Sequence, residues 1–215
     1  VEGGTGTMNP VEEARRLTHF GFDMPVQEYI GGSHGACPGC GGPIALKFLL
    51  KALGPKTVVT IPPQCSAAAM QTSTVSQVFS VFAASAAYAA GVKHGLEAIG
   101  DTETQVVSYA GDGGTYDIGI QAISGAAERN DDIIHFCGDN EAYMNTGIQR
   151  SGATPMGAWT NSSPSKKEPK KDIMTIIAGH HIPYAATLSV AYPDDFMRKV
   201  QRAKETRGFR FLKVL

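Results

Sequence analysis

The sequence predicts a single α/β domain with a largely parallel sheet flanked by helices. Short apolar runs that suit buried strands alternate with longer segments of helical periodicity. Turns rich in glycine and proline separate these segments, and we find no internal repeat. Residues 1–30 are expected to form a polar lead-in and residues 31–215 the domain. Because the chain starts without methionine and stops inside an apparent strand, we expect it to be incomplete at both ends.

The first half of the chain is expected to begin with a short helix over residues 10–17. A second helix is predicted over residues 43–53, since Pro43 suits a first helical turn and Gly54 a helix end. An apolar run over residues 57–61 follows. The alanine-rich region after it predicts one long helix over residues 76–99, preceded by loop. This helix should be buried all round, in the core or at a subunit interface.

A βαβ unit is predicted in the second half. A buried strand, a tight turn, an amphipathic helix and a second strand are expected over residues 105–110, 111–114, 116–129 and 132–137. A long loop with three prolines should cover residues 151–171. Helix, strand, helix and strand should then follow over residues 172–178, 184–190, 193–206 and 209–214.

Composition is typical of an ordinary enzyme of the cytoplasm. Of the 215 residues, 42% are hydrophobic and 18% are charged, which is enough apolar material for one large core. The formal net charge of -1, without a basic face, argues against nucleic acid as a partner. We see no apolar stretch of about 20 residues that would suggest a membrane span, and no signal-peptide core at the start.

Asp112, within Gly-Asp-Gly-Gly, and Asn140 have the spacing of a cation site. One helix and one strand separate them, so both should lie at the carboxyl ends of neighbouring parallel strands. Their oxygen atoms suit Mg²⁺. The surrounding glycines would let backbone N–H groups approach a diphosphate at the start of a helix. Taken alone, however, Gly-Asp-Gly is more typical of a simple strand-to-helix turn.

Longer segments supply a family context. The motif GDGGTYDIGIQ (residues 111–121) followed by Asn140 resembles the thiamine diphosphate motif. The segment DNEAYMNTGIQ (139–149) is similar to its equivalent in 2-oxoacid:ferredoxin oxidoreductases. GSHGACPGCGGPIALK (32–47) and NTGIQRSGATPMGAWT (145–160) extend the resemblance from about residue 31 to the last residue. It is closest to the β-type subunits that act on pyruvate.

The resemblance implies a thiamine diphosphate-binding fold and a set of site residues. Asp112, the Asn140 side chain and the Ala142 carbonyl would bind Mg²⁺. Asn145 and Thr146 would border the diphosphate and the thiazolium. The residues expected to contact the cofactor are Ser66, Gly111, Asp112, Gly113, Gly114, Asn140, Ala142, Asn145 and Thr146.

Cysteines form a second pattern. Cys37 and Cys40 make a chelating turn that aims two thiolates at one metal, and Cys65, after two prolines, is placed to supply a third. Cys137 closes an apolar strand and is expected to be a buried thiol. Zinc would normally require a second Cys or His pair. A disulfide framework suits this long, cysteine-poor chain poorly, and a redox dithiol would usually open a helix in a thioredoxin-like unit.

For the cysteines, the resemblance implies a [4Fe-4S] cluster held by Cys37, Cys40 and Cys65. Its fourth ligand would be a cysteine beyond Leu215 or, less in keeping with a buried strand, Cys137. The implied reaction is oxidative decarboxylation of a 2-oxoacid, with pyruvate favoured, to an acyl-coenzyme A. Electrons would pass from thiamine diphosphate through the cluster to ferredoxin.

The same resemblance implies partner subunits. An α-type subunit would supply the glutamate that activates thiamine, because Glu141 is too near the diphosphate end, and γ-type and ferredoxin-like δ subunits would complete the complex. Two alternatives remain open at this point. One is a non-redox thiamine diphosphate-dependent decarboxylase or synthase, and the other is a non-catalytic electron-transfer or scaffold subunit.

A few single residues also have candidate roles. His34 and Asn145 are the candidate catalytic residues of this chain, although His34 is equally suited to a structural hydrogen bond. The four lysines of residues 166–171 would either steer an acidic ferredoxin or belong to a solvated loop. We expect Trp159, the only tryptophan, to anchor this loop against another subunit.

Overall fold

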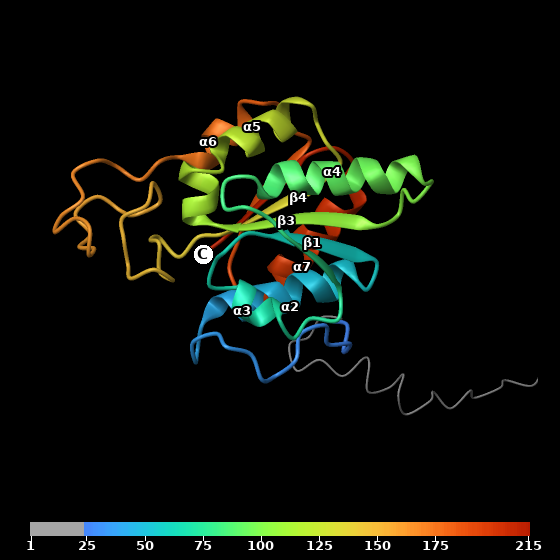
Figure 1. The fold of residues 1–215 in the computed structure, drawn as a ribbon, viewed down its shortest axis with the longest axis horizontal. Coiled ribbons are helices and arrows are strands. Elements are labelled where there is room, and N and C mark those ends of the chain that lie inside the picture. The colour runs from blue at the N-terminus through green and yellow to red at the C-terminus, as the bar shows by residue number, and fades with distance from the viewer. Residues whose placement is uncertain (1–23) are drawn as a thin grey trace, which may run out of the picture.

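A six-stranded sheet lies between two layers of helices in the computed structural model, which describes residues 24–215 (Figure 1). The strand order is β2-β1-β3-β4-β6-β5, and every neighbouring pair is parallel. The strands are β1 (Thr57–Ile61), β2 (Ser76–Phe79), β3 (Gln105–Gly111), β4 (Ile134–Gly138), β5 (Tyr184–Leu188) and β6 (Arg210–Val214). The predicted α/β class with a parallel sheet is confirmed.

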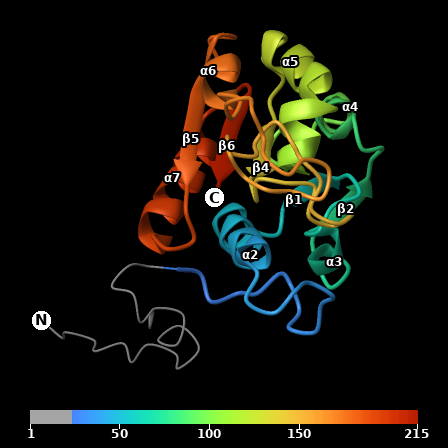
Figure 2. The ribbon, with the colours of Figure 1, turned by 90° about the vertical axis from the view of Figure 1, so that its left-hand side faces the viewer.

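Helices cover both faces of the sheet. In chain order they are α2 (Gly41–Leu53), α3 (Ala67–Met70), α4 (Ser85–Ala98), the π-helix η1 (Gly113–Asp117), α5 (Ile120–Glu128), α6 (Ile173–Ala178) and α7 (Pro193–Glu205). Figure 2 shows α2, α3 and α7 on one side and α4, α5 and α6 on the other. Within residues 24–215, none of these helices combines the length and the apolar character that crossing a bilayer requires.

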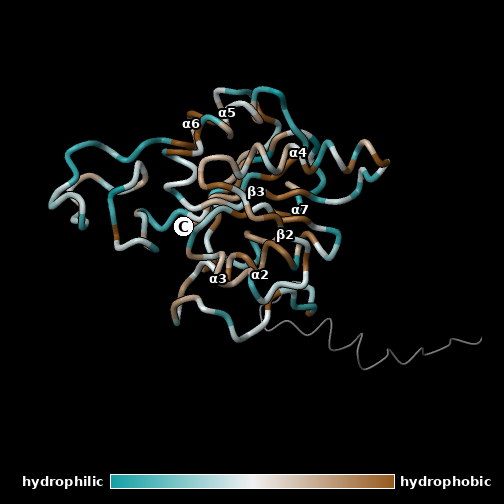
Figure 3. The backbone as a smooth tube through the Cα atoms, in the orientation of Figure 1, coloured by the Kyte–Doolittle hydropathy of each residue, from teal (hydrophilic) through white to brown (hydrophobic). Residues whose placement is uncertain are grey.

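The two faces carry separate hydrophobic cores. Successive side chains of a strand point to opposite faces, and in β4 Ile134 and Phe136 join the core under α2 and α7. Cys137, one position along, joins the core under α4, α5 and α6. Figure 3 shows the apolar segments gathered in the sheet and in α2, inside the molecule.

Most predicted elements are found within a few residues of their expected ends. The helix predicted over residues 43–53 is α2, which starts directly after Cys40. The apolar run over residues 57–61 is β1, and the strands of the predicted βαβ unit are β3 and β4. The four elements predicted after residue 171 are α6, β5, α7 and β6. The helix predicted over residues 10–17 lies outside the described residues.

The single long helix predicted over residues 76–99 is wrong. Residues 76–79 form β2, an edge strand paired in parallel with β1, and α4 begins only at Ser85. Val78 and Phe79, with polar neighbours, suit a half-exposed strand better than a helix. The helix is also not buried all round, because Tyr88, Gly91 and Gly95 lie on an exposed face.

The tight turn predicted over residues 111–114 is a wider structure. The backbone forms a π-helix over Gly113–Asp117, in which the N–H of Ile118 donates to the carbonyl of Gly113 at 3.2 Å. A Cβ at Gly119 would lie 1.9 Å from the Gly114 carbonyl oxygen, so glycine is needed where the wide turn closes. Single π turns of this kind are frequent at functional sites.

Residues 151–171, which we call the arm, contain no helix or strand, as predicted. The arm projects from the main body beside the last residue of the chain (Figure 1). Seen end-on, it crosses in front of β4 and β6 (Figure 2). It therefore lies at the edge of the sheet where the parallel strands end.

Candidate functional site

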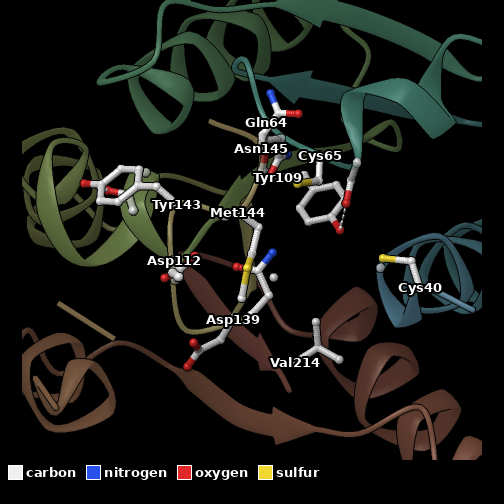
Figure 4. A pocket seen from close by; sticks show the side chains of 18 of the residues that line it. Cys40, Gln64, Cys65, Tyr109, Asp112, Asp139, Tyr143, Met144, Asn145 and Val214 are labelled. Carbon is white, nitrogen blue, oxygen red and sulfur yellow. Dashed lines mark hydrogen bonds between the residues drawn. The ribbon is translucent and has the colours of Figure 1, made fainter. Parts of the chain in front are cut away.

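A cavity of about 440 Å³ opens at the carboxyl edge of the sheet. Its walls come from the segments that follow β1, β3, β4 and β6, together with the start of α2. Between β1 and β3 the chain order of the strands reverses, which is where open α/β sheets bind ligands. Figure 4 shows Asp112 and Tyr143 on one side of this cavity and Cys40 on the other.

Three oxygen-bearing groups meet at one end of the cavity. The Asn140 side-chain amide can turn either its nitrogen or its oxygen toward Asp112. The atom in that position lies 3.0 Å from Asp112 Oδ1 and 2.8 Å from the Ala142 carbonyl oxygen. With its nitrogen in this place, the amide would donate two hydrogen bonds. With its oxygen there, three oxygens would stand together and a cation would be needed between them. The spacing suits Mg²⁺, whose neighbouring ligands lie about 2.9 Å apart in an octahedron with bonds of about 2.05 Å.

Asp112 is 2% exposed, and Ser151 Oγ donates a hydrogen bond to its Oδ2. Burial raises the pKa of Asp112 to about 6, and the charge of Asp139 acts in the same direction. A cation next to the carboxylate would oppose this shift. The carboxylate thus lies where positive charge would stabilise it.

Asp139, which also lines the cavity, is the centre of a second charged group. Its Oδ2 accepts a hydrogen bond from Tyr116 Oη at 2.7 Å and lies 2.9 Å from Lys170 Nζ. Lys213 Nζ lies 3.4 Å away. This group joins β4, the π-helix η1, the arm and β6 directly beside Asn140.

Gly113 is required by the packing of the cavity wall. A Cβ at this position would lie 2.2 Å from Tyr143 Cε1, well inside contact distance. The Tyr143 ring also packs edge-on against Phe82, and Tyr143 Oη donates to Asp117 Oδ2 at 3.0 Å. The glycine therefore lets the backbone of η1 pass directly under an aromatic side chain that lines the cavity.

Cys40 and Cys65 line the cavity away from Asp112. Cys40 Sγ and Ser66 Oγ both lie over Gly42, at 3.5 and 3.1 Å from the place where a Cβ would stand. Ser66 Oγ is 2.7 Å from the buried Tyr109 hydroxyl. Partial burial raises the pKa of Cys65, and negative charge on the nearby sulfurs of Cys40 and Cys37 acts in the same direction.

Cys37 and Cys137 differ from these two cysteines. Cys37 is exposed and precedes the cavity wall, with its carbonyl accepting from the Cys40 N–H at 3.1 Å. Cys137 is fully buried in the core under α4, α5 and α6, as expected for a structural thiol. Among residues 24–215, no three His, Cys, Asp or Glu side chains converge on a point that a single metal ion would fill. An iron-sulfur cluster does not need such convergence, because each thiolate binds a different iron atom.

The structure brings most of the predicted residues to this cavity. Its lining includes the expected residues Ser66, Gly111, Asp112, Gly113, Gly114, Asn140, Ala142, Asn145 and Thr146. His34 is not part of the lining, and its Nδ1 accepts from the N–H of Ala36 at 3.4 Å. The sequence interpretation did not identify Gln64, Phe82, Tyr143 and Met144, whose positions depend on how distant loops pack.

The solvated-loop interpretation of the four arm lysines needs correction, whereas the steering of ferredoxin stays a prediction. Lys166 is 2% exposed, and its Nζ donates to the Thr154 carbonyl at 2.6 Å. Lys170 bonds Asp139 and Glu141, and Lys171 bonds Asp117 and the carbonyl of Tyr116. Only Lys167 is exposed. Lys166 therefore holds the arm to itself, whereas Lys170 and Lys171 hold it to the body.

Comparisons with known proteins agree with this geometry. Residues 52–214 match the family described as thiamine pyrophosphate enzyme, C-terminal TPP binding domain. The chain is 43% identical over 221 residues to ketoisovalerate oxidoreductase subunit VorB of Pyrococcus horikoshii, covering 95% of this chain and 70% of the relative. It is 46% identical over 196 residues to pyruvate synthase subunit PorB of Methanothermobacter thermautotrophicus, covering 86% and 68%.

A solved structure also has the same fold. It is a 2-oxoglutarate:ferredoxin oxidoreductase from Magnetococcus marinus, with a TM-score of 0.79 at 20% identity, covering 89% of this chain and 68% of the other. Thiamine pyrophosphate is the cofactor we call thiamine diphosphate. This chain is similar to the PorB and VorB subunits, and it therefore belongs to the family of thiamine diphosphate-binding β-type subunits of 2-oxoacid:ferredoxin oxidoreductases.

Proposed function

We propose that this chain is the catalytic β-type subunit of a 2-oxoacid:ferredoxin oxidoreductase that forms an acyl-coenzyme A. The observation that carries the proposal is the single cavity that joins an oxygen-lined end at Asp112 to a thiol-lined end at Cys40 and Cys65. Pyruvate is the first candidate substrate, because the sequence most resembles the β-type subunits that act on pyruvate. The similarity to a ketoisovalerate oxidoreductase subunit makes branched-chain 2-oxoacids the next candidates.

At the oxygen-lined end, Asp112, the Asn140 side chain and the Ala142 carbonyl would bind Mg²⁺. The 3.0 and 2.8 Å separations around the Asn140 amide support this assignment. Gly111, Gly113 and Gly114, which line the cavity, would border the diphosphate, with Asn145 and Thr146 beside it. Thiamine diphosphate supplies the electron-accepting ring that decarboxylation of a 2-oxoacid requires.

At the thiol-lined end, Cys37, Cys40 and Cys65 would bind a [4Fe-4S] cluster, which supplies a one-electron acceptor. The turn at Cys37–Cys40 and the shared position of Cys40 and Ser66 over Gly42 support this assignment. The fourth thiolate would come from outside residues 24–215, because Cys137 is buried in the opposite core.

Partner subunits follow from what the cavity lining provides. No glutamate occurs among the described residues that line the cavity, and Glu141 pairs instead with Lys170 at 2.8 Å. An α-type subunit would therefore supply the activating glutamate. We include γ-type and ferredoxin-like δ subunits, with ferredoxin as acceptor, in the same proposal. Trp159, 72% exposed on the arm, would contact a partner subunit.

The test is anaerobic purification of the complex, followed by iron, sulfide and thiamine analysis and a screen of 2-oxoacids with a viologen dye. We expect a brown protein that reduces the dye with pyruvate or a branched-chain 2-oxoacid when coenzyme A is present. The subunit alone, supplied with thiamine diphosphate and Mg²⁺, should not turn over. Asp112→Ala should abolish activity of the complex.

The same experiment separates the alternatives. A colourless protein that releases an aldehyde would indicate a non-redox decarboxylase. Full activity of the Asp112→Ala complex would indicate a scaffold subunit whose cofactor site is not used. Turnover by the isolated subunit would refute the need for an α-type partner.

A further inference from the structure

The turn Ser151-Gly152-Ala153-Thr154, at the start of the arm, has no role in the function proposed above. Both hydroxyl residues are buried, with Ser151 3% and Thr154 1% exposed. The turn is closed by its own groups, since the Ser151 N–H donates to Thr154 Oγ1 at 3.0 Å and the Thr154 N–H to the Ser151 carbonyl at 3.2 Å. Such local bonds give a short segment one defined shape.

From this turn, one hydroxyl reaches each of the two loops that carry the oxygen donors. Ser151 Oγ donates to Asp112 Oδ2, after β3. Thr154 Oγ1 donates to the Glu141 carbonyl at 2.5 Å, after β4. Glu141 lies between Asn140 and Ala142 in the chain and has a φ of 67°, which a non-glycine residue rarely adopts. The turn thus bridges two loops whose relative position sets the spacing of the donors.

The hydrogen bond from Ser151 also gives the two oxygens of the Asp112 carboxylate different partners. With Oδ2 bound to Ser151, Oδ1 is the oxygen that faces the Asn140 amide. A carboxylate held at one oxygen has little freedom to rotate, so its second oxygen keeps a fixed direction. Groups of this kind, behind the ligands of a metal, set ligand orientation and metal affinity.

We propose that Ser151 and Thr154 are positioning residues for the divalent cation, holding Asp112 and the 140–142 loop at the ligand spacing that Mg²⁺ requires. This inference rests on the proposed function, because it needs Mg²⁺ and diphosphate to bind at Asp112. Lys166 stabilises the turn, because its Nζ donates hydrogen bonds to the carbonyls of Thr154 at 2.6 Å and Gly152 at 3.3 Å. The buried lysine thereby links the closed shape of the arm to the cation site.

The experiment titrates Mg²⁺ and, separately, Ca²⁺ into the cofactor-stripped complex containing the full-length subunit, with thiamine diphosphate present, by calorimetry. Ser151→Ala should weaken Mg²⁺ binding by about 10- to 100-fold. Ca²⁺ binding should weaken less, because Ca²⁺ tolerates irregular ligand geometry and Mg²⁺ does not. Thr154→Val, which removes the hydroxyl at nearly constant size, should act in the same direction, and Thr154→Ser should retain affinity for Mg²⁺.

The matched control is Ser162→Ala in the same arm. The Ser162 hydroxyl is exposed and accepts only from the Arg150 N–H, at 2.7 Å, among the described contacts. This variant should bind Mg²⁺ like the wild type. Iron content should be unchanged in all four variants, since the substituted groups lie away from the thiol-lined end of the cavity.

The outcomes are distinct. If the wild type does not bind Mg²⁺ with thiamine diphosphate, the proposed function itself is wrong. If it does, and Ser151→Ala keeps wild-type Mg²⁺ affinity, the inference is overturned. Equal losses for Mg²⁺ and Ca²⁺, together with a lower melting temperature of the stripped complex, would also overturn it, because they indicate a merely structural role. Should Ser151→Ala fail to fold, the comparison of Thr154→Val with Thr154→Ser decides the question.

Discussion

His135 shows how strongly a single side chain is controlled by its surroundings. It is fully buried in β4, with Nε2 3.1 Å from Thr115 Oγ1 and Nδ1 3.0 Å from Ser108 Oγ. Its ring stacks on Phe211, with centroids 5.6 Å apart. Burial lowers the pKa of His135 to about 3. Both ring nitrogens are bonded without a nearby anion, so the neutral ring is the stable form.

This burial predicts an acid-sensitive fold. In the unfolded chain, His135 takes up a proton near its ordinary pKa of 6.5, whereas the folded protein resists protonation to about 3. Between these values the unfolded state binds the extra proton, so the free energy of unfolding should fall by about 1.4 kcal/mol per pH unit of acidification. Above pH 6.5 the residue should have no effect.

Denaturant unfolding of the wild type and His135→Gln at pH 7.0 and pH 5.5 measures this contribution. The variant should be less stable at pH 7.0, because it loses fitted hydrogen bonds and ring stacking. It should, however, lose less stability on acidification than the wild type does. Equal losses in the two proteins would contradict the assignment to His135.

At the scale of elements, charged side chains hold the arm in place, together with the apolar contact of Ala153 with the core under α4, α5 and α6. The Lys166 ammonium lies among the carbonyls of Gly152, Thr154 and Pro169, all within the arm. Lys170 and Lys171 then join it to Asp139 and Asp117 on the body. A segment without helix or strand can keep a defined shape in this way, because its polar backbone groups find a partner.

Lys166→Met should therefore loosen the arm while leaving the sheet intact. The substitution leaves the carbonyls of Thr154 and Pro169 without a donor, whereas the Gly152 carbonyl still accepts from the Lys171 N–H at 2.9 Å. We expect a local loss of roughly 2–3 kcal/mol. Amide hydrogen exchange should speed up in the arm by about one to two orders of magnitude, with little change in β3 and β4. Lys167→Met is the matched control, since this neighbouring lysine is exposed. Similar exchange in both variants would refute the role given to Lys166.

On the scale of the whole molecule, the two edges of the sheet carry different tasks. The carboxyl edge holds the cavity, whereas the amino edge holds a buried charge cluster around Asp132, just before β4. Arg210 and Lys93, each 1% exposed, bond this carboxylate together with Arg207. Burial acts to raise the pKa of Asp132, but these three cations outweigh it and hold the pKa below its usual value. The cluster ties α4, β4 and β6 together far from the cofactor end.

Asp132→Asn should consequently lower global stability and spare the site. Removing this charge leaves the buried Arg210 without a carboxylate partner and Lys93 with only Glu97, 3.9 Å away, which costs about 3–5 kcal/mol in comparable cases. Urea denaturation should show this loss, while calorimetry on the folded complex should give wild-type affinity for Mg²⁺ with thiamine diphosphate. A variant that loses cofactor affinity but not stability would show that the two edges are not separate.

Features that depend on neighbours in the chain were predictable. The strands β3 and β4 and the helices α2 and α7 follow from apolar periodicity and from the proline and glycine at their ends. Cys137 was expected to be buried because it closes an apolar strand, and it is. The shared location of Asp112 and Asn140 followed from the parallel sheet, in which neighbouring strands end at the same edge.

Features that depend on distant partners were not predictable. The edge strand β2 is four residues long and acquires its conformation by pairing with β1, so the adjacent alanine-rich helix obscured it. Lysine is a residue type that usually lies at the surface, yet Lys166 is buried because the carbonyls of the arm surround its ammonium group.

The residues of this chain by themselves determined its α/β class, the cofactor family and the two ends of its cavity, because these depend on local pattern and on motifs. Tertiary structure alone decided that Ser151 and Thr154 bind the loops of Asp112 and Glu141. The physical reason is that a hydrogen bond depends on where two groups lie in space. The position of a loop 39 residues further along the chain is set only when the whole sheet has formed.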